Sequence, residues 1–379
     1  MRFRGLEFSL MEFAGAFGDF GTLLPFTVAY ISICKMDPSG IFLGIGITNI
    51  CLALFYRLPL PVQPKKALGV VAIREKWRPN LVYGTGIVLG LVWLLMGLSN
   101  TIDKVVAKVP KCVLRGIQLG LGLAFALEGA SMLKENPLLG AIALTIAIAF
   151  MGSRKVPASL LILSMGVAYS LYTGGFSTSN LKFGLFLPSL HFPSLQDMVY
   201  GFIFAGFAQF FLTLTNAVIA TIALIQELFP DNPQPVTPRN LALNMGVMNT
   251  VLPFIGGMPM CHGAGGLAAQ YTFGARTGGA ILMEGVLEIF LGLFLASSIE
   301  TISNAFPLAV LGAMLMTAGI ELGRVASDIR KKKEVFVMLL TAVVAVAYNV
   351  ALAFFVGLAV YFAVVKGFTK IETKNNQDH

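Results

Sequence analysis

Two lysines and a glycine-rich run are the residues of this chain most suited to binding an anion. Lys65 and Lys66 follow the segment PVQP (61–64), and a second polar stretch, GGMPMCHGAGGLAAQYTFGART, covers residues 256–277. In both stretches a proline precedes a short apolar run, which predicts an extended strand followed by a short helix. The first N–H groups of a helix lack helical partners and attract anions. A lysine there opposes the helix dipole, so a bound anion explains it better than helix stability does.

The predicted anion site combines the two helix starts with polar residues of other segments. The site consists of Gln63, Lys65, Lys66, Ala67, Thr213, Asn216, His262, Gly263, Ala264 and Gly265, with Thr22 and Gln209 as secondary candidates. An ammonium acts as a point charge that suits phosphate-like oxyanions. Structural alternatives remain open. Glycine-rich runs also form packing seams, lysines snorkel to headgroups, and hydroxyls and amides bond neighbouring helices.

Carboxylates within apolar runs form a second group of candidates. Ionisable residues at membrane depth are costly to bury, which favours a function for them. Asp19 is the candidate proton-coupling residue, with a salt bridge or a helix-break cap as the alternative. Glu128, Glu284 and Glu288 have no assigned role beyond pairing between helices or coupling. The pair Cys261-His262 lacks the ligand spacing of a zinc site, so we expect no metal and no cofactor.

Composition predicts a polytopic membrane protein. The 379 residues are 56% hydrophobic and 12% charged, about half the charged share of an average soluble protein. Fourteen apolar segments can be drawn, at about 8–33, 38–56, 64–74, 80–99, 110–132, 136–152, 156–173, 197–228, 239–255, 262–273, 277–297, 305–322, 334–348 and 350–366. With this topology most of the 27 Lys and Arg residues lie on one side, which predicts cytoplasmic termini.

The third and tenth segments predict an internal repeat. Both are too short to span a bilayer, both follow a proline-containing stretch, and they stand seven segments apart. An odd number of segments in each half inverts the halves in the membrane. The predicted fold class is therefore an all-α membrane protein with a seven-plus-seven inverted repeat. Short, Gly- or Pro-interrupted segments at matching positions indicate a transporter's substrate site.

Several stretches resemble the molybdate transporters of the sulfate permease superfamily. They are GAFGDFGTLLPF (15–26), PVQPKKAL (61–68), VLRGIQLGLGL (113–123), QFFLTLTNAVIA (209–220) and the run 256–277. The matches occur in family order and cover nearly the whole chain. Two positions depart from the family pattern: Thr272 stands where an Arg is usual, and Lys65 stands where the family has an apolar residue.

The resemblance implies a division into two domains. Residues 1–100 and 191–298 would form a core domain, and residues 101–190 and 299–379 a gate domain with a short cytoplasmic tail. In this family fold the substrate lies between the two half-helices, and the core moves against the gate like an elevator. Relatives commonly dimerise through the gate, so a homodimer is the expected oligomer.

The function expected from these observations is import of molybdate across the plasma membrane by an ion-coupled secondary transporter. Sulfate, tungstate and other oxyanions stay open as substrates, because sulfate and molybdate share charge and shape. An anion channel of the same fold is the alternative mechanism. An enzyme is not expected, since no nucleophile–base pair or pair of acids faces one cavity. The expected partners are the oxyanion and the lipid bilayer, and no nucleic acid.

Overall fold

The computed structural model describes residues 2–3, 5–99, 101–106, 109–150, 158–174, 181–231, 236–299, 301–302, 306–348 and 350–365. The start of the predicted seventh segment and the predicted cytoplasmic tail after residue 365 lie outside this range. Four described helices are long and apolar enough to cross a membrane: Pro38–Tyr56, Pro79–Leu98, Lys111–Leu133 and the run Gln209–Leu228. Five shorter apolar helices accompany them, which agrees with a polytopic membrane protein.

The described chain is mostly helical, with four short strands. The strands are β1 (Arg2–Phe3), β2 (Leu6–Glu7), β3 (Val62–Pro64) and β4 (Met260–His262). The helices are α1 (Leu10–Ala16), α2 (Phe20–Ser32), α3 (Pro38–Tyr56), α4 (Lys66–Arg74), α5 (Pro79–Leu98), α6 (Thr101–Val106), α7 (Lys111–Leu133), α8 (Pro137–Ala149), α9 (Ala158–Tyr172), α10 (Leu195–Gly201), α11 (Phe207–Leu212), α12 (Thr221–Leu228), α13 (Pro238–Val251), α14 (Ala264–Thr272), α15 (Gly279–Phe294), α17 (Leu308–Arg324), α18 (Lys332–Ala347) and α19 (Val350–Val364).

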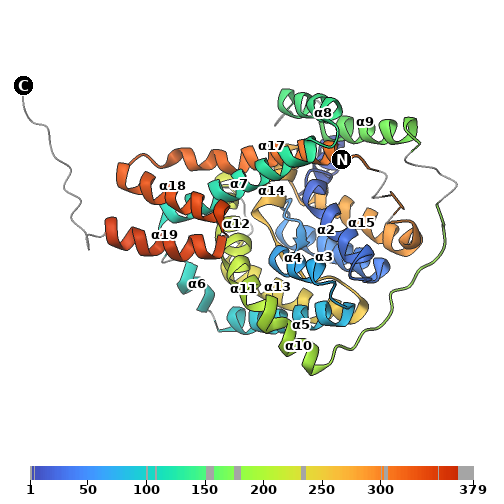
Figure 1. Cartoon of the computed structure of the whole chain (residues 1–379), viewed down its shortest axis with the longest axis horizontal. Helices are drawn as coiled ribbons and strands as arrows, with labels where there is room; N and C mark the ends of the chain where they lie inside the picture. Colours follow the sequence, from blue (N-terminus) through green and yellow to red (C-terminus); the bar gives the residue numbers. More distant parts are fainter. Residues whose placement is uncertain are drawn as a thin grey trace, which may run out of the picture.

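The helices gather into two groups. In the first group α3 packs on α15 and α5 packs on α13; in the second, α7 packs on α17 and α18, and α18 on α19. Figure 1 shows α18 and α19 at the opposite end of the molecule from α3 and α15. Glycines permit close helix contact in both groups, because a Cβ on Gly46 would lie 2.5 Å from Gly285 O, and one on Gly122 would lie 2.5 Å from Gly319 O. The division of the chain into a core and a gate domain stays a prediction.

The predicted first segment, 8–33, is not one helix. It divides into α1 and α2 with a break at residues 17–19. At this break the backbone of α14 approaches so closely that a Cβ on Gly18 would lie 2.6 Å from Ala269 O. The break therefore lies where α14, which is far away in the sequence, packs against this segment.

The predicted eighth segment contains two π-helical stretches. Phe202–Gly206 lies between α10 and α11, and Thr213–Ala220 lies between α11 and α12. In the second stretch the Thr221 hydroxyl donates a hydrogen bond to the carbonyl oxygen of Asn216, five residues earlier (3.0 Å). Such stretches widen a helix and are frequent at functional sites.

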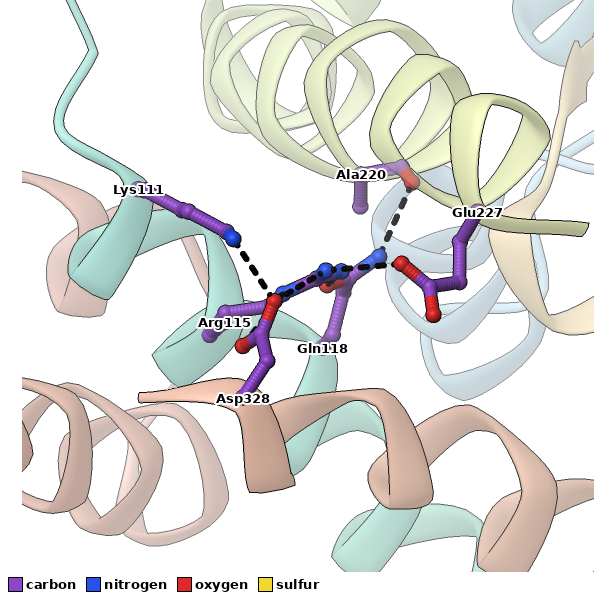
Figure 2. Close-up of polar contacts among 6 residues, drawn as sticks. All are labelled: Lys111, Arg115, Gln118, Ala220, Glu227 and Asp328. Atoms are coloured by element: carbon purple, nitrogen blue, oxygen red, sulfur yellow. Dashed lines mark hydrogen bonds and ion pairs between the residues drawn. The ribbon is translucent and has the colours of Figure 1, made fainter. Parts of the chain in front are cut away.

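A polar network lies where α7 meets α12 (Figure 2). At its centre the Arg115 guanidinium on α7 contacts Asp328, which follows α17, at 2.7 Å and Glu227 on α12 at 3.1 Å. Lys111 also pairs with Asp328 at 2.8 Å. The Gln118 amide donates a hydrogen bond to the carbonyl oxygen of Ala220 (3.4 Å). Glu227 and Ala220 therefore connect the long eighth segment to α7.

Candidate substrate site

Two short strands meet at the centre of the site, and each leads into a short helix. β3 and β4 pair antiparallel, with Val62 opposite His262 and Gln63 opposite Cys261. Helices α4 and α14 follow directly, and each has nine residues, where about 20 are needed to cross a bilayer. This confirms the predicted strand and short helix in both stretches. The pairing brings together two helix starts that are about two hundred residues apart in sequence.

Asparagine side chains hold both strands in place. The Asn49 Oδ1 on α3 accepts a hydrogen bond from the Val62 N–H (3.1 Å). The Asn249 Oδ1 on α13 accepts one from the Met260 N–H (2.8 Å), and its Nδ2 donates to the Met260 carbonyl oxygen (2.7 Å). Our sequence interpretation missed both residues. The available signal was an asparagine near the end of the apolar segment before each strand.

A small cavity lies beside this crossing. It is lined by Gln63, Pro64, Lys66, Gln209, Leu212, Thr213, Asn216 and Cys261, and its volume is about 10 Å³. The structure thus brings together five of the predicted site residues. Lys65, Ala67, His262, Gly263, Ala264 and Gly265 do not line this cavity. A space of this volume holds about one water molecule, so an oxyanion requires the site to widen.

Both lysine amines are buried without a hydrogen-bond partner in the described part of the chain. Lys65 has no exposed surface, so headgroup snorkelling does not fit it. The Lys66 Nζ lies 4.0 Å from the ring centroid of Phe125 on α7. A desolvated ammonium without a counter-charge costs several kcal/mol. Both amines therefore favour a negatively charged ligand at this place.

Several other predicted donors are already engaged. The Lys65 N–H donates to the Pro259 carbonyl oxygen (3.0 Å), so this group is not free to bind an anion in this conformation. The Gln209 Oε1 accepts from the Leu68 N–H in the first turn of α4 (3.1 Å), and its Nε2 donates to the Thr213 hydroxyl (2.9 Å). Gln209 thus caps the helix start that we expected to face an anion.

Gln63 is also bonded within the protein. Its Nε2 donates to the Thr22 hydroxyl (2.6 Å) and to the Asp19 carboxylate (3.2 Å). Asp19 is therefore connected to the strand beside the cavity, and the salt-bridge alternative does not describe its contact. His262 is fully buried with its ring 6.3 Å from that of Tyr56, and neither ring nitrogen is hydrogen-bonded in the described residues.

Two of the predicted glycines have little room for a side chain. A Cβ on Gly263 would collide with the Gln63 side-chain oxygen, and a Cβ on Gly265 would collide with the Phe125 ring. The start of α14 therefore approaches both β3 and α7 closely. The described residues contain no group of three or more His, Cys, Asp or Glu that could hold a metal ion.

Comparison with known proteins connects this geometry to a family. A family model described as molybdate transporter of MFS superfamily matches residues 11–125 and 201–322. Molybdate transporter 1 of Arabidopsis thaliana is 32% identical over 93% of this chain and 87% of its own length. Molybdate transporter 1 of Chlamydomonas reinhardtii is 28% identical over 92% of this chain and 90% of its own length.

Solved structures show the fold. The transmembrane domain of a cyanobacterium bicarbonate transporter gives a TM-score of 0.61 at 18% identity, covering 94% of this chain and 98% of that one. The murine solute carrier 26 family member A9 anion transporter, in the inward-facing state, gives 0.64 at 11% identity, covering 97% and 69%. Although the family description names the MFS superfamily, the fold is that of the solute carrier 26 anion transporters. The inverted repeat of seven and seven stays a prediction.

The family match covers more than half of the chain, and the likeness to the Arabidopsis protein extends over almost all of it. Its relatives are transporters rather than enzymes, and the apolar helices make the chain an integral membrane protein. The resemblance inferred from the sequence is thus confirmed: the chain belongs to the molybdate transporter family.

Proposed function

We propose that this protein is a secondary active transporter that imports molybdate across the plasma membrane. The observation that carries the proposal is the pair of buried lysine amines at the convergence of two helix starts, in a chain of the molybdate transporter family. Helix starts and ammonium groups both stabilise a dianion in a site of low polarity. Relatives with the printed name molybdate transporter support molybdate as that dianion.

The anion would bind where the small cavity now lies. The Lys66 ammonium supplies charge, and the free N–H groups at the starts of α4 and α14 supply donors. Ala67, Gly263, Ala264 and Gly265 contribute through the backbone, while Thr213 and Asn216 add side-chain groups from the π-helical stretch. Lys65 adds a second charge next to β4. Because the cavity is smaller than an oxyanion, binding requires separation of α4 and α14 from the neighbouring α7 and α11.

Alternating access would occur by an elevator movement. β3, β4, α4 and α14 lie within the predicted core ranges, and α7, which carries Phe125, lies within the predicted gate range. Sliding of the core past the gate would remove the Phe125 ring from Lys66 and open the site to one side and then the other. Both termini would be cytoplasmic, and two copies would associate through the gate. Proton coupling would involve Asp19, which contacts Gln63 beside the cavity.

Sulfate and tungstate are the alternative substrates, and a specific residue keeps them in consideration. Lys65 is an additional buried charge at a position where the resemblance implies an apolar residue. Extra positive charge favours a dianion of a different size without changing the type of site. Excess sulfate added during molybdate uptake separates these possibilities, because a sulfate transporter would lose molybdate uptake by competition.

The direct test is uptake of labelled molybdate by purified protein in liposomes. We expect saturable uptake by the wild type and none by Lys66→Ala, because that variant leaves the dianion without its nearest ammonium. Lys331→Ala is the matched control, since Lys331 is an exposed lysine paired with Glu334 at 3.4 Å. Normal uptake by Lys66→Ala would refute the role of Lys66. Conductance without saturation would favour a channel.

A further inference from the structure

Three carboxyl groups are buried behind strand β3. Asp19 lies between α1 and α2, and Glu284 and Glu288 lie one turn apart on α15; each side chain is at most 2% exposed. The carboxyls of Asp19 and Glu284 are within hydrogen-bonding reach of each other, so one proton can join them. Each of the three also has an oxygen without a donor among the described residues. Such an oxygen needs a bound proton or cation to be stable there.

The cluster is hydrogen-bonded to both halves of the substrate site. Asp19 Oδ2 accepts from the Gln63 side chain (3.2 Å). Glu288 Oε2 accepts from Asn49 Nδ2 (2.9 Å), and the same Asn49 holds the Val62 N–H. The cluster is thus connected to two consecutive residues of β3. Asp19 bonds directly to Gln63, and Glu288 is linked to Val62 through Asn49.

A third hydrogen bond connects the cluster to α14, the short helix that follows β4. Glu284 Oε2 accepts a hydrogen bond from Gln270 Nε2 on α14 (2.6 Å). Gln63, Asn49 and Gln270 are neutral, so none of them compensates a negative charge. Among the described residues, no ion pair involves any of the three carboxyls.

The cation that acts on this cluster, Lys66, also lies at the proposed anion site. Lys66 is the cation whose charge acts on Asp19, and Lys65 lies beside it at the start of α4. The Lys66 ammonium can balance the anion or the Asp19 carboxylate, but not both. Glu284 and Glu288 also line a cavity of about 530 Å³ with mostly apolar walls, where an ionised carboxylate is poorly solvated.

From this competition we propose that Asp19, Glu284 and Glu288 form a proton-binding site linked to anion binding. This inference rests on the proposed function and deepens it. When the dianion takes the Lys66 ammonium, the cluster loses the counter-charge of Asp19 and binds a proton from the same side. That proton leaves on the other side after the anion departs. Linkage makes the effect reciprocal, so protonation of the cluster strengthens anion binding.

A metal cation is a less suitable occupant, since the described residues contain no group of three His, Cys, Asp or Glu with metal-binding geometry. The three carboxyls instead face neutral amides and one another. A proton on a carboxyl oxygen satisfies a lone pair without needing further ligands. The cluster therefore suits a proton as its occupant.

The test is molybdate binding to the purified full-length protein by calorimetry, at about pH 6 and about pH 8. We expect the wild type to bind about tenfold more tightly for each unit of lower pH if one proton is taken up. Measurements in buffers of different ionisation enthalpy count the protons directly, and they need no variant. Glu284→Gln and Glu288→Gln should bind molybdate with a smaller pH dependence, whereas Glu334→Gln, a carboxyl outside the cluster, should behave as the wild type.

The two proposals fail in different ways. Tight molybdate binding with no proton uptake by the wild type would overturn the proton site and leave the proposed function standing. An unchanged pH dependence in Glu284→Gln, Glu288→Gln and Asp19→Asn alike would also overturn it. If molybdate bound at neither of the two pH values, the proposed function would be overturned instead.

Discussion

Lys66 illustrates how one side chain connects substrate binding to movement. Its ammonium lies over the Phe125 ring on α7, and cation–π contacts contribute about 0.5–2 kcal/mol. A dianion is a much stronger partner for an ammonium than an aromatic face. Binding therefore favours separation of Lys66 from Phe125, and with it a shift of α4 relative to α7. In the proposed mechanism, the same contact would hold the site closed in the absence of an anion.

Gly265→Ala should impair transport by disturbing this contact. A Cβ at Gly265 would collide with the Phe125 ring, and overpacking of this kind typically costs 1–3 kcal/mol. We expect molybdate uptake to fall about tenfold or more while the protein remains folded. The measurement is uptake in liposomes together with the melting temperature in detergent.

Gly323→Ala is the control for this prediction. Gly323 lies on α17, and a Cβ there would meet a Leu119 methyl group at 3.5 Å, an ordinary van der Waals distance. Its uptake should match the wild type. Equal uptake by both variants would show that the approach of α14 to Phe125 does not matter.

The sequence predicted the charged and polar lining of the site better than its supporting contacts. Lys66, Gln63, Thr213 and Asn216 were identifiable because polar residues interrupt apolar runs. The engagement of the Lys65 N–H by Pro259 was not, because it follows from the pairing of two distant strands. The local sequence pattern shows which residue types could line the site. Which of their N–H and C=O groups remain free to bind an anion depends on the pairing of strands that are distant in sequence.

At the scale of elements, the two strands depend on their asparagine supports. Asn249→Ala would leave the buried Met260 N–H and carbonyl without these partners, which we expect to lower stability by about 1–3 kcal/mol. Asn249→Asp should have an intermediate effect, because it keeps the acceptor for the N–H and loses the donor. Melting temperature and molybdate uptake measure the two consequences.

Thr145→Ala provides the comparison for the Asn249 variants. The Thr145 hydroxyl bonds to a carbonyl of its own helix, α8, in an exposed position. Its removal should change neither stability nor uptake. A loss in Thr145→Ala as large as that in Asn249→Ala would contradict a specific support of β4.

The elements themselves were predictable to different degrees. The two short helices and their strands were found from the spacing of Pro, Gly and apolar residues. The break between α1 and α2 was foreseen only in the alternative interpretation of Asp19 as a helix-break cap, and the π-helical stretch that contains Asn216 was not predicted. Both departures depend on helix packing, since α14 approaches the break at Gly18 and the π-helical stretch packs on α7. Composition alone contains no sign of such contacts.

At the scale of the whole molecule, the network around Arg115 contributes a pH-dependent term to stability. Partial burial raises the pKa of Asp328, but hydrogen bonds and charges from Arg115 and Lys111 outweigh it and hold the pKa below its ordinary value of 3.8. A depressed folded-state pKa stabilises the folded protein above the ordinary value, and this contribution is lost as the pH falls through the folded-state pKa.

We expect the melting temperature of the wild type to fall below about pH 4. Near neutral pH, the ionisation state of Asp328 does not change, so it should not alter the melting temperature there. Asp328→Asn should have a lower melting temperature at neutral pH and should lose less on acidification. The comparison of both proteins in detergent across this pH range checks the sign. A parallel acid dependence of the two proteins would exclude Asp328 as a contributor.

The same network offers a test of the elevator movement (Figure 2). Arg115 lies in the predicted gate range and its partner Glu227 in the predicted core range, whereas Lys111 and Asp328 both lie in the predicted gate range. If the core slides past the gate, the first pair must separate during transport and the second pair need not. We expect a thiol cross-linker between Arg115→Cys and Glu227→Cys to stop molybdate uptake, and a reducible linker to restore it on cleavage.

The cross-link between Lys111→Cys and Asp328→Cys is the matched control, because it stays within the predicted gate range and should leave most uptake intact. The native cysteines interfere little, since Cys34, Cys112 and Cys261 are buried and only Cys51 is exposed, so Cys51→Ser suffices as a background. Uptake by each double variant before cross-linking gives its baseline, which separates the effect of the linker from that of the substitutions. Undiminished uptake with residues 115 and 227 fully cross-linked would mean that α7 and α12 keep their contact throughout the cycle. The substrate would then have to reach both sides by rearrangement of α4 and α14 alone.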